Sequence, residues 1–132
     1  MMSRDRYPLI FRCETGAMSL IGGPPGWQHV LQRLFGELEE IVRGDIEAFR
    51  YVEADALVVR QVKSQFGELV VHSSGIRTAA IDERIRCAHE ATSRTCEMCG
   101  AHAEGDQGGM QVRCSQHAGM AWHKFLEHTD ES

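Results

Sequence analysis

Apolar residues recur every three or four positions in the stretch WQHVLQRLFGELEEIVR, residues 27–43. The positions that keep this spacing are Trp27, Val30, Leu31, Leu34, Phe35, Leu38, Ile41 and Val42. Such spacing gathers them on one face of a helix, so the pattern predicts a helix over residues 27–43. Gly36 interrupts the stripe at a cost of up to about 1 kcal/mol relative to alanine, which indicates either close packing at that point or a weak spot.

The pattern changes to two runs rich in β-branched residues, 57–62 and 69–72, on either side of KSQFG. Runs of this kind that flank a short glycine-containing segment are typical of an antiparallel hairpin, which we expect over residues 57–72. Earlier in the chain, the short apolar segment YPLIF (residues 7–11) indicates a further short strand.

A second helix is predicted over residues 78–94. Thr78 is a suitable N-cap, and Ile81, Ile85 and Ala88 fall on one face of AAIDERIRCAHEATSR. Residues 1–94 are therefore expected to form an α+β core in which helices pack on a small antiparallel sheet.

Composition narrows the class of protein. With 132 residues, 42% apolar and 25% charged, the chain fits one globular domain with a small appended module. No apolar run approaches the roughly 20 residues that span a bilayer, and the N-terminal segment lacks the uninterrupted apolar stretch of a signal peptide. We therefore expect a cytoplasmic protein, and in that reducing compartment clustered cysteines are more typical of metal sites than of disulfides.

The cluster lies in the last third of the chain. Cys96 and Cys99 form CxxC, fourteen residues intervene, and Cys114 and His117 form CxxH. Two close pairs separated by a hairpin-sized gap are what a tetrahedral zinc ion needs, and Gly100 after the second cysteine lets the backbone turn tightly. His102 could replace His117 as the fourth ligand, although it follows Cys99 so closely that we prefer His117.

The segment after the second pair selects the type of zinc module. Apolar residues at helical spacing follow His117, which predicts an amphipathic helix whose start supplies the second ligand pair. A treble-clef module fits this order, and a zinc ribbon is the alternative. We therefore expect residues 95–132 to form a zinc-binding module packed on the core.

The predicted zinc is structural rather than catalytic. A catalytic zinc usually keeps three protein ligands and an open water position, whereas this sequence offers four. The H-x-E motif of zinc deaminases does not precede the CxxC, and the acidic module disfavours an HNH-type nuclease. Cys13 and Cys87 lie outside the cluster and are expected to be buried or half-buried thiols. The sequence therefore assigns no catalytic residue.

Several of these pieces together resemble a family of small, mostly uncharacterised bacterial and phage-encoded proteins. Members begin with a Gly-Trp helix, carry a motif of the type QVKxKFGxL, and end in RTCExCG followed by CxxH. The matching pieces here are Gly26-Trp27, QVKSQFGEL (61–69), RTCEMCG (94–100) and the pair Cys114 and His117. The family's arginine and aromatic residues after FGxL are replaced here by Val70, Val71 and His72, so a surface role of that strand in relatives does not carry over. No activity is general to the family, and the resemblance therefore implies the fold and the zinc rather than a function.

Charge suggests the kind of partner. The formal net charge is -5, and residues 95–132 carry six acids against two bases, a net of -4. An acidic surface repels nucleic acid and attracts a basic protein. We therefore expect a non-enzymatic protein-binding module, of which an inhibitor of the immunity or anti-defence type is one form. The acids expected on its contact face are Glu97, Glu104, Asp106 and Glu127.

The alternative function is a nucleic-acid-binding zinc-finger regulator. Its basic patch would come from the arginines around the second predicted helix, Arg77, Arg84, Arg86 and Arg94. Acids at Asp82, Glu83 and Glu90 would neutralise such a patch if they pair with those arginines.

Overall fold

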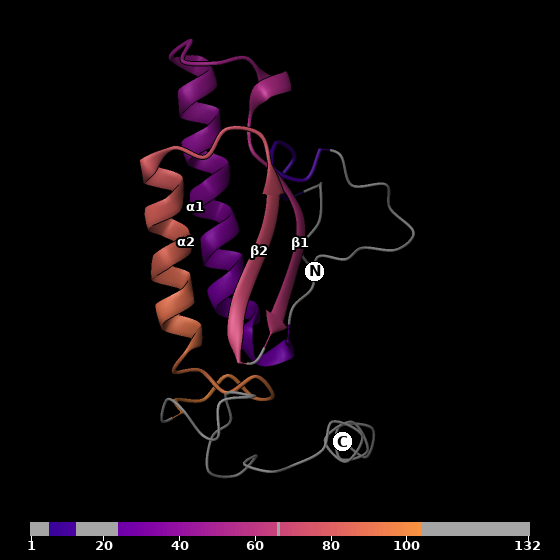
Figure 1. Ribbon diagram of the computed structural model, residues 1–132, viewed down its shortest axis with the longest axis vertical. Coiled ribbons are helices and arrows are strands. Elements are labelled where there is room, and N and C mark those ends of the chain that lie inside the picture. The colour runs from indigo at the N-terminus through magenta and orange to yellow at the C-terminus, as the bar shows by residue number, and fades with distance from the viewer. Residues whose placement is uncertain (1–5, 13–23, 66, 104–132) are drawn as a thin grey trace.

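The computed structural model describes residues 6–12, 24–65 and 67–103, and it has an α+β architecture (Figure 1). In chain order, a 3₁₀ turn η1 (Pro25–Trp27) leads into the helix α1 (Gln28–Glu47), and a second 3₁₀ turn η2 (Glu53–Asp55) precedes the sheet. Strands β1 (Val58–Gln65) and β2 (Glu68–Ser74) are followed by the helix α2 (Ala79–Thr92). Neither helix is long and apolar enough to cross a membrane in this part of the chain.

The sheet is a two-stranded antiparallel hairpin. The pairing runs from Val58 opposite Ser74 to Gln65 opposite Glu68, with an irregularity between Val59 and Gln61. The strands are thus longer than the two predicted runs, because polar residues on both sides of the turn also join the ladder. Gly67 stands at the turn with a φ of 80°, a conformation in which glycine meets no steric penalty.

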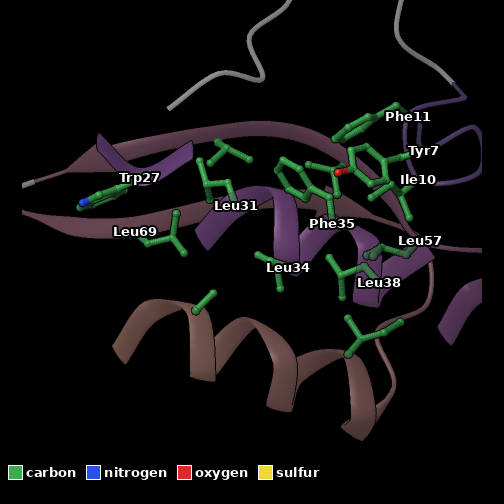
Figure 2. Packing of buried hydrophobic residues seen from close by; sticks show 14 of the residues in the cluster. Tyr7, Ile10, Phe11, Trp27, Leu31, Leu34, Phe35, Leu38, Leu57 and Leu69 are labelled. Carbon is green, nitrogen blue, oxygen red and sulfur yellow. The ribbon is translucent and has the colours of Figure 1, made fainter. Parts of the chain in front are cut away.

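Helix α1 is the central element. Figure 2 shows Trp27, Leu31 and Phe35 pointing toward the hairpin, while Leu34 and Leu38 point toward α2. All five side chains are essentially fully buried, as the apolar stripe predicts. One helix therefore joins both outer layers through two adjacent parts of a single apolar face.

Two boundaries of α1 differ from the prediction over 27–43. Trp27 belongs to the preceding 3₁₀ turn, and the helix continues to Glu47 through Gly44. Added Cβ atoms at Gly36 and Gly44 would meet nothing within 4 Å, so neither glycine serves close packing. The sequence left two explanations open for Gly36, close packing or a weak spot in the helix, and the open space around it supports the weak spot.

Helix α2 begins as predicted at its cap. The hydroxyl of Thr78 accepts a hydrogen bond from the backbone N–H of Ile81 at 3.3 Å, which confirms Thr78 as N-cap. Ile81 and Ala88 are buried, and Ile85 is partly buried against the same core. The helix ends at Thr92, two residues before the predicted end.

The prediction of a strand at residues 7–11 is wrong, because this segment forms turns that cover the core. Its backbone N–H groups at Leu9 and Ile10 donate to the buried carboxylate of Glu39 on α1, at 3.1 Å each. The segment makes one backbone bond to the sheet, from Val59 N–H to Ile10 O. A side chain satisfies these donors, so a β-ladder is not needed.

Candidate metal centre

The cysteine pair at the start of the predicted zinc module lies in a tight turn directly after α2. Thr95 and His102 form an antiparallel bridge, and within it the N–H of Cys96 donates to Ala101 O at 2.8 Å. The N–H of Gly100 returns to Cys96 O at 3.0 Å. The five residues from Cys96 to Gly100, which we call the CxxCG turn, therefore bring both cysteines into one loop.

Gly100 makes this reversal possible. Its φ of 80° lies in the left-handed region, which residues with a Cβ rarely adopt. This finding agrees with the expectation that the glycine after the second cysteine turns the backbone. A CxxC pair followed by such a glycine presents two thiolates to one ion, which is half of a tetrahedral zinc site.

The CxxCG turn and the residue before it pack against η1, which leads into α1. The N–H of Gly26 donates to Glu97 O at 2.7 Å, and the indole N–H of Trp27 donates to Thr95 O at 2.9 Å. A Cβ added to Gly26 would lie 2.0 Å from the carbonyl oxygen of Cys96. Only a glycine therefore fits at residue 26 while the two backbones stay this close.

Burial within the turn is uneven. Cys96 and Met98 belong to the hydrophobic core, and Cys99 is exposed. Glu97 is only 3% exposed, so its assignment to a charged contact face is wrong. Glu97 lies in the turn that packs against Gly26, and its backbone carbonyl accepts the hydrogen bond from Gly26 N–H.

The remaining predicted ligands lie outside the described residues. These ligands are Cys114 and His117. Cys13 and the predicted contact-face acids Glu104, Asp106 and Glu127 also lie outside the described residues. Across residues 6–12, 24–65 and 67–103, no group of three or more Cys, His, Asp or Glu side chains could hold a metal ion. His102, the alternative ligand, is exposed in the bridge opposite Thr95.

Sequence reasoning missed two neighbours of the turn. In the sequence, Gly26 stands out only as part of a Gly-Trp pair, and His29 lies in the predicted helix without a motif around it. An added Cβ at Gly100 would lie 3.4 Å from Cε1 of the His29 ring, which places that exposed imidazole beside the turn. The only local signal was the breaker GGPPG before the helix, which does not say where the glycine docks.

Cys87 is exposed on α2, so the expectation of a buried or half-buried thiol is wrong for this residue. Its Sγ lies 3.8 Å from Oε1 of Glu83. The three apolar positions Ile81, Ile85 and Ala88 take the inward face of α2, and Cys87 falls beside that face.

The arginines of α2 and its flanks are largely occupied by acids. Arg77 pairs with Asp82 at 2.7 Å, Arg84 pairs with Glu37 of α1 at 3.2 Å, and Arg86 pairs with both Glu83 and Glu90. The hydrogen bond from Arg86 is the main cause that lowers the pKa of Glu83. Three of the four arginines of the basic patch considered for nucleic acid therefore have carboxylate partners.

Comparison of the chain with models of known protein families, with curated proteins and with solved structures gave no match.

Proposed function

We propose that this chain is a non-enzymatic protein-binding module whose C-terminal third is organised by one structural zinc ion. The ligands in this proposal are Cys96, Cys99, Cys114 and His117. The observation that carries it is the CxxCG turn, because a bridge, a returning hydrogen bond and a left-handed Gly100 bring two cysteines into a single loop.

A structural role fits the surroundings of the turn. Cys96 is fully buried, Glu97 O in the turn accepts a hydrogen bond from Gly26, and Thr95 O directly before the turn accepts one from Trp27. A zinc ion held there would link the core to the chain beyond residue 103 in one closed site. Structural zinc in small modules supplies roughly 10 to 16 kcal/mol of apparent binding energy, which can order a segment with few apolar residues.

Protein binding is favoured over nucleic-acid binding by charge. The chain carries a net charge of -5, and the arginines Arg77, Arg84 and Arg86 are engaged by acids of the same chain. Such a surface suits a basic protein partner and repels phosphate. Inhibition of a cationic enzyme, by occupying the cleft in which that enzyme holds nucleic acid, is the role that this chemistry fits.

Elemental analysis tests the metal part of the proposal. The wild-type protein, purified without chelator, should contain about one zinc per chain, and Cys99→Ser should lose it because closed sites rarely survive removal of a thiolate. Cys87→Ser is the matched control, since it removes an exposed thiol outside the cluster and should leave the metal in place. A wild-type protein without zinc, or full zinc in Cys99→Ser, would refute the assigned site.

The regulator alternative is tested by a gel shift on DNA and RNA at several salt concentrations. Nucleic acid should bind weakly, because the chain carries a net charge of -5 and carboxylates engage three of the four arginines of the candidate basic patch, which leaves fewer cations to replace phosphate counterions there. Tight binding with a steep salt dependence would replace the protein-binding proposal with the regulator.

A further inference from the structure

The C-terminus of α1 closes in a Schellman motif with a phenylalanine at the position that glycine usually takes. The N–H of Arg50 donates to Asp45 O at 2.9 Å, and the N–H of Phe49 donates to Ile46 O at 3.0 Å. These are the two hydrogen bonds that define the motif. Phe49 has a φ of 61°, and within the described residues it is the one non-glycine residue with positive φ.

Neither backbone preference nor packing explains a phenylalanine at this position. A bulky residue in the left-handed region is a conformational outlier, which glycine or asparagine would avoid. The side chain of Phe49 is 94% exposed, so it does not stabilise the core of this chain. Strained residues of this kind persist where they serve a function, and an exposed aromatic side chain is a frequent anchor in binding.

The segment that carries Phe49 is held in place by Asp45. One carboxylate oxygen of this largely buried residue pairs with Arg50 at 3.3 Å, and the other accepts a hydrogen bond from the Tyr51 hydroxyl at 3.0 Å. The residues on the C-terminal side of Phe49 are thereby tied to the helix. The ring is therefore presented from a fixed backbone, which lowers the entropy lost on binding.

Two more exposed apolar residues lie beside η2: Val52 directly precedes it, and Ile76 is hydrogen-bonded to its last residue, Asp55. Val52 is 62% exposed and Ile76 is 39% exposed, and they complete the set of exposed large hydrophobic residues in the described part of the chain. The N–H of Ile76 donates to Asp55 O at 3.0 Å, which ties the segment after β2 to η2.

Carboxylates accompany these apolar residues. Glu47, Glu53 and Asp55 are exposed, and among the described residues none of them forms an ion pair. Arg50, the base next to Phe49 in the sequence, is already paired with Asp45, and the guanidinium of Arg12 donates to the backbone carbonyls of Ala56 and Leu57. This end of the molecule therefore combines an apolar anchor with exposed carboxylates that form no ion pair within the described residues.

We propose that this end is the docking surface for a protein partner that has an apolar pocket bordered by lysine or arginine. The surface, called the apical patch, consists of Phe49, Val52 and Ile76 with the carboxylates Glu47, Glu53 and Asp55. Phe49 enters the pocket, and the carboxylates steer the basic rim and fix its orientation. The proposal rests on the protein-binding function and adds its location, at the opposite end of α1 from the CxxCG turn (Figure 1).

The negative charge of the apical patch favours a basic protein over a second copy of the chain or an anionic lipid surface. A second copy of the chain would bring two sets of these carboxylates together, and like charges at an interface oppose association. An anionic lipid surface would be repelled for the same reason.

The test places the photoreactive residue p-benzoylphenylalanine at position 49 in the full chain, expressed in the organism that encodes it. The same residue at position 72 is the control, because His72 is exposed on β2, away from the apical patch. After irradiation, mass spectrometry identifies the crosslinked residues. Position 49 should crosslink to another protein at an apolar segment flanked by lysine or arginine, and position 72 should not crosslink to that segment.

Binding of the purified partner then tests the anchor. Phe49→Gly should weaken the complex by at least about 30-fold, as for a central aromatic anchor. Loss of folding would not account for this effect, because glycine relieves the positive φ and the variant should melt at a higher temperature than the wild type. Glu53→Lys combined with Asp55→Lys should reduce the association rate and its dependence on salt.

Four crosslinking results at position 49 would overturn the apical patch. They are a crosslink from position 49 to a second copy of the chain, a crosslink to lipid, a crosslink to an acidic protein surface, and no crosslink at all. A partner that crosslinks at position 72 and binds Phe49→Gly normally would remove the patch while protein binding stands. Failure of the zinc site is read separately, from the metal content.

Discussion

Gly26→Ala is expected to separate the CxxCG turn from the start of α1. The new Cβ would lie 2.0 Å from Cys96 O and 2.7 Å from both Glu97 C and Gly100 N. Non-bonded carbon and oxygen atoms normally stay more than about 3.3 Å apart, so the two backbones must separate by an ångström or more. All three of these neighbours are backbone atoms, so no side-chain rotation can relieve the contact.

The free-energy cost of Gly26→Ala can be estimated from the hydrogen bonds that this separation breaks. The hydrogen bond from Gly26 N–H to Glu97 O is 2.7 Å long, and the bond from the buried Trp27 indole to Thr95 O is 2.9 Å. Each lost bond costs about 1 kcal/mol, or more where a donor stays buried, and overpacking adds about 1 to 3 kcal/mol. We expect the free energy of unfolding to fall by roughly 3 to 5 kcal/mol, a large part of the roughly 5 to 15 kcal/mol that is typical of a natural protein.

Urea denaturation followed by circular dichroism measures this loss. Gly36→Ala is the matched control, because it adds the same methyl group to α1 where nothing lies within 4 Å, and it should raise stability by up to about 1 kcal/mol. If the chain holds the proposed zinc, Gly26→Ala should also release it at lower chelator concentration than the wild type, since the CxxCG turn moves. If Gly26→Ala unfolds at the same urea concentration as the wild type, the tight docking of the turn is wrong.

Three further predictions concern the helix ends. Thr78→Ala removes the side-chain acceptor for Ile81 N–H and should cost about 1 kcal/mol in urea denaturation, whereas unchanged stability would show that the cap contributes little. Phe49→Gly should raise the free energy of unfolding by about 0.5 to 1 kcal/mol and the melting temperature by about 2 to 4 °C. The reason is that the strain of a left-handed phenylalanine exceeds the entropy cost of glycine. A lower melting temperature would contradict this prediction. Burial, followed by the hydrogen bond to Asp45, raises the pKa of Tyr51 to about 12. The stability that the protonated Tyr51 contributes is therefore complete below about pH 10 and is lost as the pH rises toward about 12. In an absorbance titration at alkaline pH, Asp45→Asn should lower this pKa, and an unchanged titration would exclude the carboxylate as a cause.

The described secondary structure was largely predictable, because its signals are local. Apolar residues in the stripe of α1 lie within a few positions of each other, and Thr78 caps α2 through a hydrogen bond to a residue three positions later. The β-branched runs likewise indicate the hairpin without reference to the rest of the chain. In the candidate metal site, Cys99 was expected from spacing and Gly100 from the need to turn after it, and Gly100 does turn the backbone there, with a φ of 80°.

Where α1 ends could not be predicted, because the local signals are reversed. Gly44, a usual terminator, lies inside the helix, and Phe49 takes the left-handed position that ends it. Asp45 holds this end through Arg50 and Tyr51, in an arrangement of side chains whose geometry appears only in the folded loop.

Long-range contacts decided the remaining features. The sequence by itself determined that Cys96 and Cys99 can share a turn, since that depends on spacing and on one glycine. Only the tertiary structure brought Gly26 against this turn, some 70 positions away in the sequence, and buried Glu97 there. Contacts between distant segments depend on how the whole core packs, and no pattern within a short window encodes which two backbones will meet.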